Sequence, residues 1–431
     1  MPNLTPLSYL FIALIALFGI VGQWAETGVP WWRLAAAAYL GGLFYEWTRV
    51  RAVRPSARLN SRAELRLGQR SAIELALSHN APMPQPVQWA FAAPALVTAS
   101  RSVQRAVLEP ARETTLKLPA TAVELGEAAL NDVSLRLLGP LGLGWWRQQA
   151  PLPGQLSVVP DTLSRGALAF ALDRVGEVSR RRIGVGQELY QLRAYQPGDP
   201  RHHIDWKATA RSGDLMTRVF AEAQLLEVMV VLDVGRTSRN QLDGLSQLGH
   251  YVNLAARLAE HAVACGDRIG LVAVSDRPVT LVPPGHDQNT LLRIRRALGA
   301  LRSEPLESDM LAAAREMSRV VRHRCLVIVL TDLFGIDASG RLTQAIRLWV
   351  PQHLPVIVGL TGAELTALTS QAADDWLDPY VSLAAEDYRL NLSRGMEGLR
   401  ALGAETLSSR PEALEDNLFR RYQQLKARRR V

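Results

Sequence analysis

Two aspartates of this chain each close a continuous apolar run. Asp233 ends the run LLEVMVVLD, and Asp332 ends the run RCLVIVLTD. Hydroxyl side chains stand close by in the sequence, on Thr237 and Thr331. Oxygen atoms are the ligands that hard cations such as Mg²⁺ and Ca²⁺ prefer. The sequence therefore predicts an oxygen-ligand cation site, provided that both runs end at the same place in the fold.

The two apolar runs have the character of strands in a parallel sheet. Continuous apolar runs suit strands that are buried on both faces, and ligands of open α/β sheets bind beyond the carboxyl ends of the strands. Apolar residues recur at three- and four-residue steps from Leu245 to Ala262, which predicts a helix that stops at Gly266. Further strands are expected at 267–275, 278–282, 354–360 and 405–407, and further helices at 288–301, 308–321, 342–350, 384–402 and 412–429. This alternation predicts a parallel sheet wrapped by helices.

The N-terminal segment contains two apolar stretches. Residues 6–24 and 31–47 approach the roughly 20 apolar residues that span a bilayer. Arginines follow the second stretch with no acid before Glu64, so the positive-inside rule places the rest of the chain in the cytoplasm. We therefore expect a transmembrane hairpin that anchors the chain in the inner (cytoplasmic) membrane. A cleaved signal peptide is the rival interpretation, although the first residues lack Lys and Arg; a hairpin buried in a larger membrane complex also stays open.

Composition and the middle of the chain indicate an ordered, multidomain protein. The chain is 48% apolar and 21% charged, which argues against disorder. It has only two cysteines and no CxxC pair, so structural zinc is not expected. Between about 55 and 160, short stretches alternate apolar with polar residues and are separated by Gly, Pro, Asn and Ser. Such spacing predicts an antiparallel β-sandwich or barrel.

The stretch 179–220 differs in composition from the segments on either side of it. The tetrapeptide PGDP at 197–200 is a strong turn signal. Charged and aromatic residues surround it, and those expected to contact a partner or the next domain are Arg193, Tyr195, Asp199, Arg201, Asp205, Trp206 and Arg211. One interpretation is a salt-bridged connector, in which Asp205 or Arg201 bonds across to the α/β domain. The other is a docking surface with Trp206 and the arginines as its contacts.

The motif YQPGDPRHHIDW at 195–206, followed by Ala210-Arg211 and the strand that ends on Asp233, resembles the bacterial domain of unknown function 58 family. GPLGLGWW at 139–146 and LSVVP at 156–160 fit the same resemblance. The family implies two N-terminal spans, a β-rich region and a von Willebrand A-like domain. The expected divisions are two transmembrane helices at 1–48, a sandwich-like domain at 49–165, the signature connector at 166–222, and a Rossmann-like von Willebrand A domain with C-terminal helices at 223–431. The resemblance also implies a MoxR-type AAA+ ATPase as partner.

The metal motif of von Willebrand A domains, Asp-x-Ser-x-Ser, reads Asp233-Val-Gly235-Arg-Thr237 in this chain. By the same resemblance Ser308 takes the place of the family's threonine and Asp332 that of its late aspartate. These residues predict a weak Mg²⁺ site, because Gly235 supplies no hydroxyl; the substitution Gly235→Ser is expected to tighten it. In the alternative interpretation, the two aspartates only cap helices or bond to loop amides.

The function that these features favour is a membrane-anchored protein-interaction module, acting with the ATPase in assembly or activation of other complexes. A metal-dependent hydrolase using Asp233 and Asp332 is the enzymatic alternative, but the sequence has no GxSxG, HExxH or P-loop motif. The net charge of +8 could indicate nucleic acid. The arginines gather after the apolar stretches and at the C-terminus, which favours membrane lipid, and no nucleic-acid partner is expected.

Overall fold

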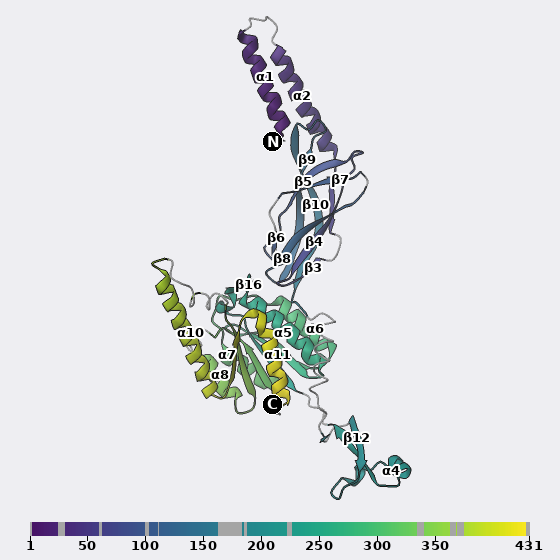
Figure 1. The fold of residues 1–431 in the computed structure, drawn as a ribbon, viewed down its shortest axis with the longest axis vertical. Helices are drawn as coiled ribbons and strands as arrows, with labels where there is room; N and C mark the ends of the chain where they lie inside the picture. The colour runs from purple at the N-terminus through teal and green to yellow at the C-terminus, as the bar shows by residue number, and fades with distance from the viewer. Residues whose placement is uncertain are drawn as a thin grey trace. The chain divides into compact units, whose positions relative to one another are not determined.

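The computed structural model describes residues 2–24, 31–59, 63–99, 103–110, 112–162, 183–184, 188–221, 226–333, 340–362, 368 and 375–427. The chain divides into two compact units, residues 1–159 and residues 160–431 (Figure 1). Each unit has its own buried core.

The first unit joins two helices to β-sheets. The helices are α1 (Pro6–Trp24) and α2 (Trp31–Ala52). One sheet has the order β1 (Asn3–Leu4), β10 (Gly144–Val159), β9 (Gly126–Leu138), β5 (Gln85–Phe91) and β7 (Gln104–Leu108), with β3 (Ala63–Arg66) paired to β10. The other has the order β2 (Ser56–Leu59), β4 (Arg70–Ser78), β8 (Thr114–Ala122) and β6 (Val97–Ala99). Each described pairing between these strands is antiparallel, except that of β3 with β10.

Alternation of side chains explains why these segments form half-buried strands. In β8 the residues Leu116, Leu118 and Ala120 are buried, while Lys117 between two of them is exposed. Successive side chains of a strand point to opposite faces. One face of β8 therefore packs into the core of the first unit and the other faces solvent.

A buried carboxylate ties α2 to the turn at residues 139–146. Glu46 is fully buried and accepts hydrogen bonds from the backbone N–H groups of Leu141 (3.0 Å) and Leu143 (2.9 Å) and from the indole N–H of Trp146 (3.2 Å). A Cβ at Gly139 would overlap the Glu46 carboxylate. The glycine-rich sequence of this turn is therefore required by packing against a charged side chain.

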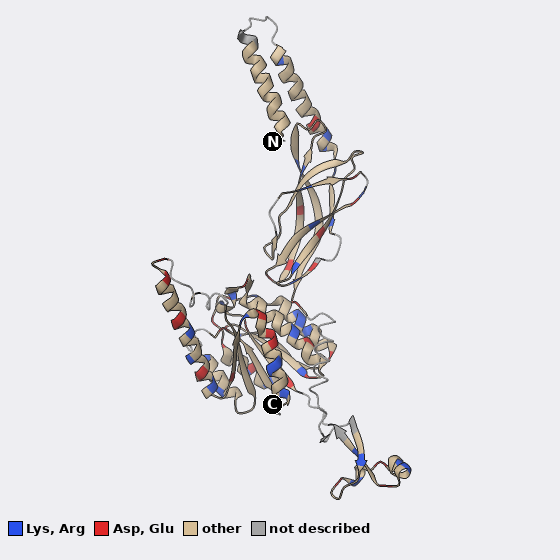
Figure 2. Ribbon diagram, in the orientation of Figure 1, with Lys and Arg blue, Asp and Glu red and all other residues tan. Residues whose placement is uncertain are grey.

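The same turn holds the start of α1. The Thr5 hydroxyl donates to the Gly142 carbonyl (2.7 Å), and the Ser8 hydroxyl donates to the Leu143 carbonyl (2.5 Å). Both helices are thus anchored at one end by hydrogen bonds to the turn that joins β9 and β10. Most charged residues of α2 lie toward this end (Figure 2).

The two N-terminal helices correct the membrane prediction. Their positions match the two apolar stretches, but no described helix combines the length and apolarity needed to cross a membrane. In α2 the charged residues Arg33, Glu46, Arg49 and Arg51 interrupt the apolar sequence, and Glu46 serves as a buried hydrogen-bond acceptor. The predictions of a transmembrane hairpin, of a membrane anchor and of an inner-membrane location are wrong on this finding.

The second unit is built around a six-stranded sheet. Its order is β18 (Pro278–Gly285), β17 (Arg268–Val274), β14 (Glu227–Asp233), β19 (Leu326–Leu330), β20 (Leu354–Leu360) and β21 (Glu405–Ser409). The pairings from β17 to β21 are parallel, whereas β18 is antiparallel to β17. The sheet is therefore mixed, and the prediction of a parallel Rossmann-like sheet is wrong. The reason is the connection at residues 275–277, because parallel strands need a crossover of a dozen or more residues.

Helices cover the central sheet. They are α5 (Gln247–Ala264), α6 (Gln288–Ala300), α7 (Met310–Val320), α8 (Arg341–Trp349), α10 (Asp378–Ala401) and α11 (Pro411–Ala427). Side chains of α7, α8 and the second half of α10 share one core with β14, β17, β19 and β20. Helix α5 contacts β14 and β17, and α6 and α11 contact α5. Helix α5 begins where the Ser246 hydroxyl accepts from the Gly249 N–H (3.1 Å), as an N-cap does.

A small antiparallel sheet carries the signature motif. Its order is β11 (Ile183–Gly184), β13 (Met216–Ala221) and β12 (Glu188–Ala194). Between β12 and β13 lie the 3-10 turn η1 (Arg201–His203) and the short helix α4 (Trp206–Ser212). The chain from β12 to β13, residues 188–221, is called the arm below.

Candidate functional site at the carboxyl edge of the central sheet

Asp233 is the last residue of β14, and its carboxylate is held by three donors. The Thr331 hydroxyl donates to Oδ2 at 2.6 Å, the Gly235 N–H donates to Oδ1 at 2.9 Å, and the Ser308 hydroxyl also donates to Oδ1. Only 6% of Asp233 is exposed. A buried carboxylate is tolerated when hydrogen bonds replace its hydration, and here both oxygens are satisfied.

The order of the strands explains how these groups meet. Strands β14 and β19 are parallel neighbours with Leu232 opposite Leu330, so Asp233 and Thr331 follow at the same edge. Ser308 arrives from the loop before α7, where the Asp309 N–H donates to the Ser275 carbonyl at the end of β17 (2.6 Å). Three segments of the chain therefore converge on one carboxylate.

Asp332 lies at the same edge and is half-buried. Burial is the main cause that raises the pKa of the neighbouring Tyr251 phenol, and the charges of Asp332 and Asp233 raise it further. The Tyr251 hydroxyl donates to the Thr331 carbonyl (2.7 Å) and accepts from the Leu360 N–H (3.2 Å). The two carboxylates thus lie near one buried phenol, which stays neutral and joins β19 to β20.

Thr237 stands apart from this arrangement. It belongs to the 3-10 turn η2 (Arg236–Arg239), where its carbonyl accepts from the Asn240 N–H at 3.0 Å. Among the described residues, the hydroxyls bonded to Asp233 are those of Ser308 and Thr331. From the predicted set the structure brings Asp233 and Ser308 into contact, and Thr331 supplies the second hydroxyl. Asp332 lies close enough to Tyr251 for its charge to raise the pKa of that phenol.

Gly235 has a packing role that the sequence did not reveal. A Cβ at this position would lie 2.7 Å from the Leu306 carbonyl oxygen, 2.5 Å from the Ser308 Oγ and 3.1 Å from the Ser308 N. The Arg236 N–H donates to the same Leu306 carbonyl (2.8 Å), which fixes the loop there. A serine would collide with backbone atoms, so Gly235→Ser requires this loop to move.

The chemistry of the donor set suits a weakly held, hydrated cation. A hydroxyl that donates its hydrogen keeps lone pairs that can face a cation; Ser308 and Thr331 are in this state, and Asp332 adds a carboxylate. Mg²⁺ retains several waters and needs only one or two carboxylates. No group of three or more His, Cys, Asp or Glu side chains suited to a metal occurs among the described residues. Were Mg²⁺ to bind at this edge, the oxygens available to it would be those of Ser308, Thr331 and Asp332.

Signature residue Asp199 organises the turn of the arm. Its carboxylate accepts from Arg193 Nη2 at 2.7 Å and from the Gln196 N–H at 2.9 Å. The hydrogen bond from Arg193 is the main cause that lowers the pKa of Asp199. Half-buried Tyr195 begins this turn, and its N–H donates to the Leu215 carbonyl (2.7 Å).

Asp205 performs a similar task at the start of α4. It accepts from the Ala208 N–H at 3.0 Å, as an N-cap, and from Arg218 Nε at 2.9 Å. These hydrogen bonds, that from Ala208 first, lower the pKa of Asp205. Both partners belong to the arm, so the described contacts of Asp205 hold the arm together and do not reach the central sheet. Trp206, Arg201 and Arg211 are exposed.

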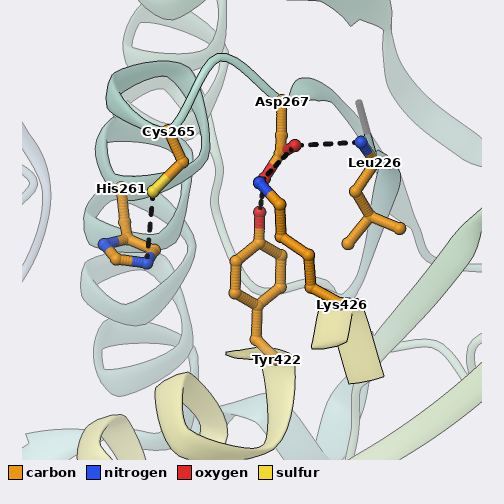
Figure 3. Close-up of polar contacts among 6 residues, drawn as sticks. All are labelled: Leu226, His261, Cys265, Asp267, Tyr422 and Lys426. Atoms are coloured by element: carbon orange, nitrogen blue, oxygen red, sulfur yellow. Dashed lines mark hydrogen bonds and ion pairs between the residues drawn. The ribbon is translucent and has the colours of Figure 1, made fainter. Parts of the chain in front are cut away.

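A buried ion pair that the sequence did not reveal lies at the other end of the sheet (Figure 3). Asp267 has no exposed surface; it accepts from the Leu226 N–H (2.9 Å), from Lys426 Nζ (2.8 and 2.7 Å) and from the Tyr422 hydroxyl. The pair joins the loop before β17 to α11. No local signal predicts it, because Lys426 lies 159 residues after Asp267.

His261 and Cys265 lie beside this ion pair, with the His261 Nε2 and Cys265 Sγ 3.7 Å apart (Figure 3). Burial raises the pKa of the Cys265 thiol to about 11 and lowers the pKa of His261. Both groups are therefore neutral near pH 7, and a thiol in this state is a poor nucleophile. We therefore interpret His261 and Cys265 as packing residues beside the ion pair and not as reactive groups.

A family model matches part of the chain. Residues 191–361, from β12 to the end of β20, match the family described as "Protein of unknown function DUF58". The predicted family is confirmed. The match covers most of the arm and the carboxyl edge of the central sheet. Uncharacterized proteins of Mycobacterium bovis and Mycobacterium tuberculosis are each 24% identical to it over 244 residues, which are 53% of this chain and 76% of the relative.

Solved structures resemble parts of this chain only remotely. The hypothetical protein BatB from Bacteroides thetaiotaomicron is 11% identical with a TM-score of 0.31, over 47% of this chain and 99% of that protein. A fragment of alpha-2-macroglobulin from Escherichia coli is 24% identical with a TM-score of 0.22, over 26% of this chain and 17% of that one. Neither likeness bears on function.

Proposed function

We propose that this DUF58 chain is a non-enzymatic protein-interaction module that binds its partner at the carboxyl edge of the central sheet. The observation that carries the proposal is the state of Asp233. Its carboxylate is buried and bonded to Ser308, Thr331 and the Gly235 N–H, so it positions hydroxyls and is not available as a general base. This engagement argues against the hydrolase alternative, which needs Asp233 as a reacting group.

The edge can recognise a partner through a shared cation. Mg²⁺ at Ser308, Thr331 and Asp332 would keep open positions, because these groups supply few direct ligands. An acidic side chain of a partner protein would complete the coordination. The family resemblance suggests a MoxR-type AAA+ ATPase as that partner, with assembly or activation of other complexes as the process.

The test measures binding of the full-length chain to a purified MoxR-type ATPase from the same organism. We expect binding that requires Mg²⁺, is reversed by EDTA, and weakens at least tenfold in Asp332→Asn. The matched control is Asp276→Asn, which removes an exposed acid just beyond the end of β17 at the same edge. An affinity for the ATPase that is unchanged both by EDTA and by Asp332→Asn would contradict the proposal. Calorimetry with MgCl₂ alone separates loss of the cation from loss of the partner contact.

A further inference from the structure

Helix α10 has two faces of opposite character. Ala385, Leu392 and Leu399 are buried, and the last two belong to the core beneath the central sheet. The first half of the helix extends beyond that sheet (Figure 1). In its exposed stripe, Trp376 stands just before the helix begins, and Tyr380 and Leu383 follow it on the helix at steps of four and three residues. One face of α10 therefore holds the core and another carries large apolar groups into solvent.

The exposed stripe has the composition of a protein-binding surface. Trp376, Tyr380 and Leu383 are 76%, 64% and 68% exposed, and the rings of Trp376 and Tyr380 form an edge-to-face pair with centroids 6.5 Å apart. Trp and Tyr dominate the energetic centres of interfaces. Apolar anchors three, four and seven residues apart are how a helix presents itself to a groove or to another helix.

This stripe is also strongly acidic. Residues 361–388 contain no Lys, Arg or His, although the whole chain has a net charge of +8. Asp375 and Asp387 are exposed on this segment, and the first cation beyond it, Arg389, is paired with Glu386. The surface formed by Asp375, Trp376, Tyr380, Leu383 and Asp387 is called the α10 surface. It fits a ligand that is both basic and aromatic.

The arm of the same protein carries the complementary surface. Trp206 is 68% exposed, and Arg201, Lys207 and Arg211 are exposed around it. The carboxylate within this stretch, that of Asp205, accepts hydrogen bonds from the Ala208 N–H of α4 and from Arg218. Figure 2 shows Lys and Arg on α4. The surface formed by Arg201, Trp206, Lys207 and Arg211 is called the α4 surface.

We propose that the α4 surface of one copy docks on the α10 surface of a second copy. Each surface repels a copy of itself through like charges, so the contact is heterologous and joins copies head to tail. Such contacts close into rings or continue as chains. Opposite charges steer the encounter and select the register, while Trp206 packs against Trp376, Tyr380 and Leu383 and supplies the apolar burial.

The experiment follows the full-length chain by sedimentation velocity over a range of concentrations. Non-ionic detergent is present throughout, because α1 and α2 also expose apolar side chains. We expect association that grows with concentration and weakens with salt, as screening of charges requires. The α4-reversed variant, Lys207→Glu with Arg211→Glu, and the α10-reversed variant, Asp375→Lys with Asp387→Lys, should each remain monomeric.

Mixing the two reversed variants distinguishes this contact from general loss of association. The α4-reversed copy keeps a native α10 surface and the α10-reversed copy keeps a native α4 surface, and the two reversed surfaces are complementary in charge as well. An equal mixture should therefore regain association, with copies of the two variants alternating. A single chain that carries all four substitutions should associate again, because the charges are complementary once more. Tyr380→Ala tests the apolar part without a charge change and should also reduce association.

Control variants are Arg322→Glu and Asp276→Lys, which reverse exposed charges elsewhere on the second unit and should associate as the native chain does. A native chain that stays monomeric at every concentration would overturn the proposal. So would reversed variants that associate normally, or a mixture that stays monomeric while each variant keeps the native melting temperature. None of these measurements depends on the ATPase or on Mg²⁺. A negative result here would therefore leave the proposed function untouched, and a failure of ATPase binding would leave this proposal untouched.

Discussion

The Thr331 hydroxyl donates a 2.6 Å hydrogen bond to the Asp233 carboxylate across the ends of two neighbouring parallel strands. Both side chains are buried, at 5% and 6% exposure. The hydrogen bond links β14 to β19 just beyond the last strand pairing between them, at the point where loops diverge.

Removal of this hydroxyl should destabilise the second unit. Thr331→Val keeps the shape of the side chain and leaves Asp233 Oδ2 without its donor, which costs about 1–3 kcal/mol when the acceptor is buried. The control Ser318→Ala removes a hydroxyl that only bonds the Ala314 carbonyl within its own helix, and should change stability by less than about 0.5 kcal/mol. Chemical denaturation measures both. Equal effects of the two substitutions would contradict a special role for the Asp233 contact.

Gly235→Ala should be more damaging than its size suggests. Its Cβ meets the Leu306 carbonyl oxygen at 2.7 Å, so the loop must move, and overpacking of this kind costs about 1–3 kcal/mol. Gly299→Ala is the matched control, since nothing lies within 4 Å of a Cβ there and alanine favours the helix by roughly 1 kcal/mol. Thermal unfolding should therefore shift in opposite directions for the two variants. A stabilised Gly235→Ala would show that the loop is not fixed as described.

Lys426→Met should strongly destabilise the packing of α11. Asp267 is fully buried, and loss of one partner from a buried ion pair costs about 3–5 kcal/mol. The paired substitution Asp267→Asn with Lys426→Met removes both charges and should recover part of this loss. A double-mutant cycle on unfolding free energies measures the coupling. Additive effects would mean that the two charges do not interact.

Stability should fall as the pH is lowered from 7 toward 5. Burial lowers the folded pKa of His261 and of His353 below the ordinary value of 6.5. The unfolded chain therefore takes up protons before the folded chain does, so stability is fully present above about pH 6.5 and is lost as the pH falls through the folded pKa values. Urea denaturation across this range should show a shallower pH dependence in His261→Gln and His353→Gln. The exposed His202→Gln serves as control and should keep the native profile.

Gly139→Ala should disturb the first unit through Glu46. The added methyl group would overlap a carboxylate that three N–H donors hold in place, so the carboxylate must leave some of them. We expect a loss of about 1–3 kcal/mol. Gly41→Ala adds the same group to α2 where nothing lies within 4 Å, and should be tolerated. If both variants melt alike, the glycine-rich turn has another explanation.

The positions where the two strands of the site end could be predicted from the sequence, because the signal lies in the residues of the strands themselves. The apolar run before Asp233 has the composition of a strand buried on both faces, and β14 does end on that residue. The run before Asp332 contains β19. Once both were placed in one sheet, the proximity of Asp233 and Thr331 followed from the geometry of parallel neighbours.

Other features depend on distant partners and were not accessible. Gly235 was interpreted as a lost hydroxyl, whereas its role is set by Leu306 and Ser308, which come from another loop. Glu46 lies within the second predicted membrane span, at 31–47, whereas the structure buries it against the turn that joins β9 and β10. The apolar stretches gave the positions of α1 and α2 correctly, but apolar composition alone did not establish that they cross a membrane. The antiparallel pairing of β18 with β17 results from the short connection between them, which is too short for the crossover that parallel strands need.

The pairing of Asp267 with Lys426 has a consequence for synthesis of the chain on the ribosome. Chains grow from the N-terminus, and domains generally fold as units during or after their emergence. Asp267 emerges 159 residues before its cation, so until then the carboxylate has no ammonium partner. Closing the sheet over an unpaired charge is costly, which delays completion of this unit until α11 has been made. A prematurely terminated chain would retain that defect, and cellular proteases would recognise it as unfinished.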